Sequence, residues 1–216
     1  MTGQWRFLDL SLGNHALYSE VLGRMRTGSQ TVLDLGCAFG QDIRRLVFDG
    51  ADGAHCYGSD LQLDFLNLGY ELFRDEETLG AKFIQADIFD PSSPLSQLDG
   101  KVDIIHAASF FHLFSRADQK QIAHRVVALM KPTKDTLLLG RQMASREPGE
   151  QPRSTGEGRQ TNATHFRHDE NTWREFWTET GEEAGGVKFD VTVVTRDRVM
   201  QNGFKMPFME YSVRRL

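Results

Sequence analysis

The sequence has few cysteines, no excess of basic residues and no long apolar run. Only two cysteines occur among 216 residues. Cys37 lies in a glycine turn and Cys56 in an expected buried strand, so we do not expect a structural disulfide. The formal net charge is −5, whereas proteins that bind the phosphate backbone usually present a basic face. A nucleic-acid partner is therefore not expected.

No apolar run reaches the length that a membrane-spanning helix needs. The first residues also lack the basic-then-apolar layout of a signal peptide. These absences predict a cytoplasmic protein without a membrane partner. The seven histidines form no ligand pattern with cysteine or acidic residues, so no metal site is predicted. With 39% hydrophobic and 25% charged residues, residues 1–216 are expected to form one globular domain.

Short buried runs, typical of strands, alternate along the chain with amphipathic segments, typical of helices. This alternation predicts an α/β fold, a mostly parallel sheet with helices on both faces. The expected strands are 31–35, 54–59, 82–86, 102–107, 136–140, 187–195 and 208–214, and the expected helices are 14–26, 41–48, 62–73, 115–131 and 170–183. No helix separates the last two strands, which predicts a C-terminal antiparallel hairpin at the sheet edge.

Two stretches lie outside this alternation. Residues 1–28 are expected to be an N-terminal helical segment of the same domain. Residues 143–168 are rich in serine, arginine, glutamate, proline, glycine and threonine and contain almost no apolar residues. Loops of this length in a compact domain are usually functional or disordered. We therefore expect an exposed loop near the active site.

The stretch from Val32 to Gly40 is typical of a buried strand that runs into a tight glycine turn and then a helix. Gly36 and Gly40 can adopt backbone angles closed to other residues and let the main chain approach a ligand. The following helix directs its free N–H groups to the same place. The pattern indicates a cradle for a nucleotide cofactor, although an ordinary strand-to-helix turn would also use two glycines.

Three acidic residues strengthen this interpretation, because each stands at the carboxyl end of an expected strand. Asp34 precedes the glycine turn, Asp60 ends the second strand and Asp87 ends the third. Ligands bind at this edge of an open parallel sheet. Asp60 could accept hydrogen bonds from both ribose hydroxyls, and Asp87 from an adenine amino group. Each acid alone could be a helix cap or a turn residue.

With these residues the chain resembles the class I S-adenosylmethionine-dependent methyltransferases over nearly its whole length. That resemblance implies a Rossmann-like, seven-stranded sheet and S-adenosyl-L-methionine as the cofactor. The family's acidic and glycine-rich motif is present as Asp34-Leu35-Gly36-Cys37-Ala38-Phe39-Gly40, with Ala38 at the middle glycine. Carried over by position, the cofactor-binding residues are Asp34, Gly36, Cys37, Gly40, Asp60, Leu61, Asp87, Ile88, Ala107 and Ser109.

A narrower resemblance links the chain to fungal methyltransferases of secondary metabolism, from meroterpenoid and polyketide pathways. It rests on Arg6-Phe7-Leu8-Asp9-Leu10, Tyr57 to Leu61, Ile105 to Phe114 and Phe166-Arg167-His168. It implies O-methylation of a carboxylate or hydroxyl of a small apolar natural product. Relatives carry more helical sequence before the first segment, so we expect part of a lid to be missing here. A second copy could cover the site, as in a homodimer.

His112 is the candidate general base, because it follows the fourth expected strand near the family's acceptor site and histidine titrates near neutral pH. It could also be a turn residue packed against Phe111 and Phe114, and a carboxylate acceptor would need no base. Phe111 and Phe114 indicate an apolar substrate pocket. Arg167 and His168 could clamp an acidic substrate, or simply flank a helix.

Four other interpretations stay open at this point. His106, inside an apolar strand, is expected to be a core histidine, and Arg141 and Gln142 are second-rank candidates for the site. The chain could also be a scaffold or regulatory partner that binds the cofactor without methyl transfer. A nicotinamide-dependent oxidoreductase ranks last, because the turn is not Gly-x-Gly-x-x-Gly and the late hairpin fits the methyltransferase sheet better.

Overall fold

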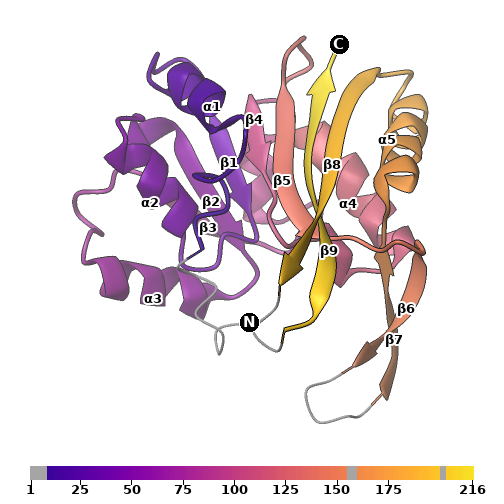
Figure 1. The fold of residues 1–216 in the computed structure, drawn as a ribbon. Coiled ribbons are helices and arrows are strands. Elements are labelled where there is room, and N and C mark those ends of the chain that lie inside the picture. The colour runs from indigo at the N-terminus through magenta and orange to yellow at the C-terminus, as the bar shows by residue number, and fades with distance from the viewer. Residues whose placement is uncertain (1–8, 155–159, 200–202) are drawn as a thin grey trace.

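One sheet of seven strands runs through the middle of the molecule in the order β3-β2-β1-β4-β5-β9-β8 (Figure 1). The first five strands are parallel, and β9 runs antiparallel to both of its neighbours. This computed structural model describes residues 9–154, 160–199 and 203–216. The strands are β1 (Val32–Leu35), β2 (Cys56–Asp60), β3 (Lys82–Gln85), β4 (Ile104–His106), β5 (Leu137–Met143), β8 (Phe189–Val199) and β9 (Lys205–Arg215).

In the described part of the chain, five α-helices cover the sheet. They are α1 (Tyr18–Met25), α2 (Gln41–Phe48), α3 (Leu63–Phe73), α4 (Arg116–Leu129) and α5 (Glu170–Glu183). The mostly parallel α/β fold with a late antiparallel hairpin is confirmed. The first helix begins four residues later than the expected 14–26, and residues 1–8 of the expected N-terminal segment lie outside the described residues. None of the described helices is both long and apolar enough to cross a bilayer.

Two apolar layers lie on opposite faces of the sheet. Successive side chains of a strand point to opposite faces, so Val32 packs with α1 and α2, while Leu33 packs with α4 and α5. The first layer contains Val21, Met25, Ile43, Leu46, Ile104 and Leu139. The second contains Ile105, Leu138, Ile122, Val126, Trp173 and Phe176. Burial on both faces explains why the parallel strands are continuous apolar runs.

The strand order reverses between β1 and β4, which lie side by side in parallel register. From β1 the chain crosses over to β2 and β3 on one side, whereas β4 leads to β5 on the other. Crossovers that leave in opposite directions open a crevice outside the carboxyl ends of the two strands. The fold therefore places the ligand site at the edge where the sequence places its glycine turn.

The expected loop over 143–168 is wrong. Instead β5 extends to Met143, and β6 (Gly149–Ser154) pairs antiparallel with β7 (Gln160–Arg167) in a separate two-stranded sheet. Figure 1 shows this ribbon projecting from the main body. Main-chain hydrogen bonds hold the two strands of such a ribbon together. A strand whose two faces both meet solvent needs no alternation of apolar and polar residues, so the sequence pattern does not reveal it.

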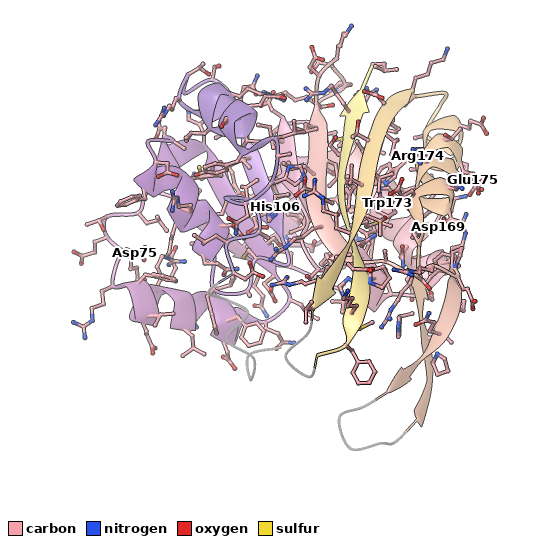
Figure 2. The ribbon with its side chains drawn as sticks, viewed as in Figure 1. Asp75, His106, Asp169, Trp173, Arg174 and Glu175 are labelled. Carbon is pink, nitrogen blue, oxygen red and sulfur yellow. The ribbon has the colours of Figure 1, made fainter. Side chains whose placement is uncertain are left out.

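The ribbon is joined to the core by His168, which is 1% exposed. Its Nε2 donates to Gln119 Oε1 of α4 at 3.1 Å, and its Nδ1 lies 3.2 Å from Thr172 Oγ1 of α5. Its ring centroid is 5.2 Å from that of Trp173, a buried residue of α5 (Figure 2). Burial lowers the pKa of His168 to about 3. The expected substrate clamp at His168 is wrong, because the side chain is buried and both of its ring nitrogens are hydrogen-bonded inside the fold.

We expect His168 to make the fold acid-sensitive. Its folded pKa of about 3 lies below the usual 6.5. The contribution of His168 to the free energy of unfolding is therefore complete above pH 6.5, and it decreases at lower pH because the unfolded chain takes up a proton that the folded chain does not. The wild type should lose about 1.4 kcal/mol between about pH 7.5 and 5.5 from this group. Chemical denaturation should show a smaller loss for His168→Gln. The control is His124→Gln, because His124 is a partly exposed residue of α4. Equal losses of stability in the wild type, His168→Gln and His124→Gln would contradict the role of His168.

Candidate active site

A cleft of about 400 Å³ opens at the carboxyl edge of the sheet, over the junction of β1 and β4. We call it the switch-point cleft. Its walls come from the glycine turn after β1, the ends of β2 and β3, the turn after β4, and side chains of the N-terminal segment, β5 and β8. Segments that lie far apart in the sequence therefore meet at a single concave surface.

The glycine turn forms the floor of this cleft. Gly36 has a φ of 69° and Gly40 a φ of 66°, in the left-handed region that favours glycine. A Cβ on Gly36 would lie 2.7 Å from a ring carbon of Phe110, so only glycine leaves space there. Ala38, at the motif's middle glycine, has a φ of 49°, and its N–H donates to Asp60 Oδ2 at 3.0 Å. The turn thus tolerates the extra methyl group.

Two carboxylates stand at the next strand ends. Besides Ala38, Asp60 accepts a hydrogen bond from the Gln62 N–H at 3.0 Å. Asp87 accepts one from the Phe89 N–H at 2.9 Å, and its side chain is exposed. A carboxylate offers about four lone-pair sites, so both groups keep acceptor capacity for hydroxyl or amino donors of a ligand.

Aromatic rings form the wall on the β3 and β4 side. The ring centroid of Phe114 lies 5.4 Å from that of Phe110 and 5.5 Å from that of Phe89. Ile88 and Leu113 extend this apolar surface. The turn is held by Ser109, which has a φ of 53° and donates its N–H to the Arg141 carbonyl at 2.7 Å. This wall suits an apolar ligand.

A buried polar network lies on the α1 and α2 side of the sheet. His106 Nδ1 is 2.7 Å from Asp34 Oδ1, and its Nε2 is 3.2 Å from Ser11 Oγ. Ser11 Oγ in turn donates to Asp42 Oδ2 at 2.8 Å. Burial alone would lower the pKa of His106, but the Asp34 carboxylate outweighs it and raises the pKa. The network ties the N-terminal segment to β1, β4 and α2, and Figure 2 shows His106 at the centre of the molecule.

The cleft brings together many of the residues that the sequence singled out. Those in its lining are Gly36, Asp60, Leu61, Asp87, Ile88, Ser109 and Phe114. Asp34, Cys37 and Ala107 are buried at 3%, 2% and 0% exposure and lie outside the lining, as does Gly40, the N-cap of α2. Their place in the structure is to shape the cleft, and a direct contact with the cofactor stays a prediction.

Other expected substrate and catalytic residues do not line the cleft. His112 is 8% exposed, and its N–H donates to Gln142 Oε1 at 3.2 Å. Phe111 is fully buried, with its ring centroid 5.4 Å from that of Trp173. Arg167 borders a separate shallow pocket beside Ala144 and Met206. The expected acceptor contact of Phe111 is wrong, because its side chain is packed in the core. Arg167 lies outside the lining of the cleft, and its contact with an acceptor stays a prediction.

The cleft also contains residues that the sequence did not single out as ligands. Asp9 and Ser11 come from the N-terminal segment, and Arg198 comes from the end of β8. Asp9 was visible only as part of the Arg6 to Leu10 segment, of which residues 6–8 lie outside the described residues. No sequence pattern marked Arg198 as a ligand-binding residue, because a single arginine in an edge strand is usually solvated.

Comparison with known proteins gives a consistent result. Residues 32–133 match the family model described as a methyltransferase domain. O-methyltransferase phiE of a fungal species is 38% identical over 192 residues, which cover 88% of this chain and 62% of the relative. The asnovolin E/chermesin D methyltransferase nvfJ of Aspergillus novofumigatus is 38% identical over 184 residues, which cover 85% of this chain and 64% of the relative. The chain thus spans less than two thirds of the length of these relatives.

The fold is shared with solved structures at low sequence identity. An S-adenosylmethionine-dependent methyltransferase from Methanosarcina mazei superposes with a TM-score of 0.67 at 15% identity, covering 91% of this chain and 97% of the other. The strand order, the glycine turn and the acidic strand ends agree with the sequence matches. In sequence the chain is similar to methyltransferases, and it has the fold of the S-adenosylmethionine-dependent methyltransferases.

Proposed function

We propose that this chain transfers the methyl group of S-adenosylmethionine to an oxygen of a small apolar natural product, and that the acceptor oxygen belongs to a carboxylate. The observation that carries this proposal is the composition of the switch-point cleft. It combines a nucleotide-type cradle with an aromatic wall and holds no side chain that titrates near neutral pH among the residues described. Each part of this composition has a chemical consequence.

The cradle fits the cofactor. Gly36 lets the turn pack closely against the ring of Phe110, which a Cβ would meet at 2.7 Å. Asp60 has lone pairs for two ribose hydroxyls, and Asp87 can accept from an adenine amino group. When bound, the cofactor supplies a methyl carbon that carries a good leaving group on the far side. The chain's residues then have to align the acceptor with that carbon and exclude water.

The lining favours an acceptor that is already ionised. Among its described residues there is no histidine, lysine, tyrosine or cysteine. Its three acids are engaged: Asp60 and Asp87 accept main-chain hydrogen bonds, and Asp9 is ion-paired. A carboxylate is ionised at neutral pH and needs no base. Its lone pair forms the C–O bond as the C–S bond breaks, so no proton has to move.

The names of the relatives support a natural-product acceptor. One relative is named an O-methyltransferase, and another is named for asnovolin E and chermesin D. The aromatic wall formed by Phe89, Phe110 and Phe114 is suited to a hydrophobic acceptor of this kind. The role of general base at His112 is not part of this proposal, because that side chain does not line the cleft.

Replacing Asp60 is expected to weaken cofactor binding. Asp60→Ala removes the acceptors for the ribose hydroxyls, and we expect the Kd for S-adenosylhomocysteine to rise about tenfold to a hundredfold in calorimetry. Asp60→Asn keeps one oxygen acceptor, so its Kd should lie between those of the wild type and Asp60→Ala. Asp64→Ala, an exposed acid in the first turn of α3, is the matched control. An unchanged Kd for Asp60→Ala would mean that the cofactor lies elsewhere.

The pH dependence of turnover tests the nature of the acceptor. We expect kcat to be flat between about pH 6 and 8, because a carboxylate has already lost its proton there. His112→Gln should keep kcat within about twofold, since a missing general base would cost far more. Single-turnover assays across this range measure both. A kcat that rises through neutral pH in the wild type and loses that rise in His112→Gln would contradict the proposal and restore His112 as the base.

A further inference from the structure

Asp9, Arg141 and Arg198 form a charged cluster in the lining of the switch-point cleft. The Oδ2 atom of Asp9 lies 2.6 Å from Arg141 Nη2 and 2.8 Å from Arg198 Nη2. Arg141 comes from the carboxyl end of β5, Arg198 from the end of β8 and Asp9 from the N-terminal segment. One carboxylate therefore serves two guanidinium groups, which leaves the three side chains with a net charge of about +1.

The two guanidinium groups have donor capacity beyond Asp9. Each carries five N–H donors, and the Nε of Arg141 is buried without a hydrogen-bond partner in the part of the chain that the structure describes. Arg198 is 42% exposed along its side chain. Glu210 faces Arg141 across the β5–β9 pair but does not line the cleft. An unsatisfied buried donor beside an open cleft indicates a missing acceptor.

We propose that Arg141 and Arg198 bind a carboxylate group of the ligand, and that Asp9 occupies this subsite in the free protein. Planar guanidinium groups match a carboxylate with two parallel hydrogen bonds. This inference rests on the proposed function, which gives the ligands two such groups: the acid of the acceptor and the amino-acid tail of the cofactor. The shared chemistry is a carboxylate, and the experiment distinguishes its two sources.

The position of the cluster argues against a purely structural role. A staple between the N-terminal segment, β5 and β8 would need only matched charges, whereas this cluster has excess positive charge. The cluster also lines a cleft in which the other charged side chains, Asp60 and Asp87, are acidic. The cleft therefore has an acidic end and a basic end, and a ligand carboxylate is repelled from the first and attracted to the second.

The carboxylate of Asp9 competes with the ligand in this account. Burial by itself would raise its pKa, but the hydrogen bonds and charges of Arg198 and Arg141 outweigh burial and hold the pKa below its usual value. Asp9 is therefore ionised at neutral pH. Asp9→Asn removes this internal anion while keeping the size of the side chain, so it should strengthen the binding of a ligand acid.

The test measures binding to the whole chain with paired probes. Calorimetry compares 2-naphthoate with the neutral 2-naphthamide, and S-adenosylhomocysteine with 5′-methylthioadenosine, which lacks the amino-acid tail. The variants are Arg141→Met, Arg198→Met and Asp9→Asn. Arg146→Met is the matched control, because Arg146 is 75% exposed, pairs with Asp197 at 2.8 Å and lies outside the cleft.

We expect each cluster arginine variant to weaken one carboxylate probe by about tenfold or more, with its neutral counterpart unchanged. Loss of naphthoate alone assigns the subsite to the acceptor, and loss of S-adenosylhomocysteine alone assigns it to the cofactor tail. Asp9→Asn should tighten the same probe. Unchanged affinities for both carboxylate probes in both arginine variants would overturn the proposal and leave the cluster as a staple.

Two further readouts keep these outcomes separate. Thermal melting shows whether a methionine variant is folded. A methionine variant that is not folded is replaced by Arg141→Lys or Arg198→Lys, which keep the charge but lose the planar guanidinium group. A wild type that does not bind S-adenosylhomocysteine would refute the proposed function. The comparison of naphthoate with naphthamide needs no cofactor and would still test the subsite.

Discussion

The parallel pairing of β1 with β4 is the constraint on which the rest of the structure depends. It reverses the strand order, and the crevice opens where the crossovers diverge. Asp34 and His106 are register partners across this pair, and their hydrogen bond continues through Ser11 to Asp42. Buried charges destabilise a fold unless they are paired and hydrogen-bonded. In this network Asp34, His106 and Asp42 are hydrogen-bonded, and Ser11 is held beside the cleft as a result.

The cleft has two ends with different chemistry. Asp60 and Asp87 give one end the acceptors that ribose and adenine donors need, whereas Arg141 and Arg198 make the other end basic. The aromatic wall of Phe89, Phe110 and Phe114 also lines the cleft. A class I fold alone does not define an activity, so this distribution of charge and apolar surface is what supports methyl transfer to an apolar acid. The orientation of the ligands follows from the same distribution.

Local patterns in the sequence predicted the fold and the cofactor end of the site, because strands, glycine turns and strand-end acids are encoded within a few residues. Of the basic end only Arg141 was a candidate, because Asp9 and Arg198 are 189 positions apart and meet only in the folded chain. Adjacent phenylalanines after β4 were also ambiguous. A short 3₁₀ turn (Phe111–Leu113) leaves Phe110 in the cleft and turns Phe111 into the core. The ribbon of β6 and β7 escaped prediction because its side chains are largely polar.

The most direct test of this account is calorimetry of the purified chain with S-adenosylmethionine, S-adenosylhomocysteine and a nicotinamide dinucleotide. The account predicts micromolar binding of the first two and none of the dinucleotide, because the glycine turn and Asp60 form a cradle for one nucleoside. Binding of the dinucleotide alone would contradict the assignment of the cleft. Failure of all three to bind would contradict it as well, and would favour a scaffold that has kept the fold without the cofactor.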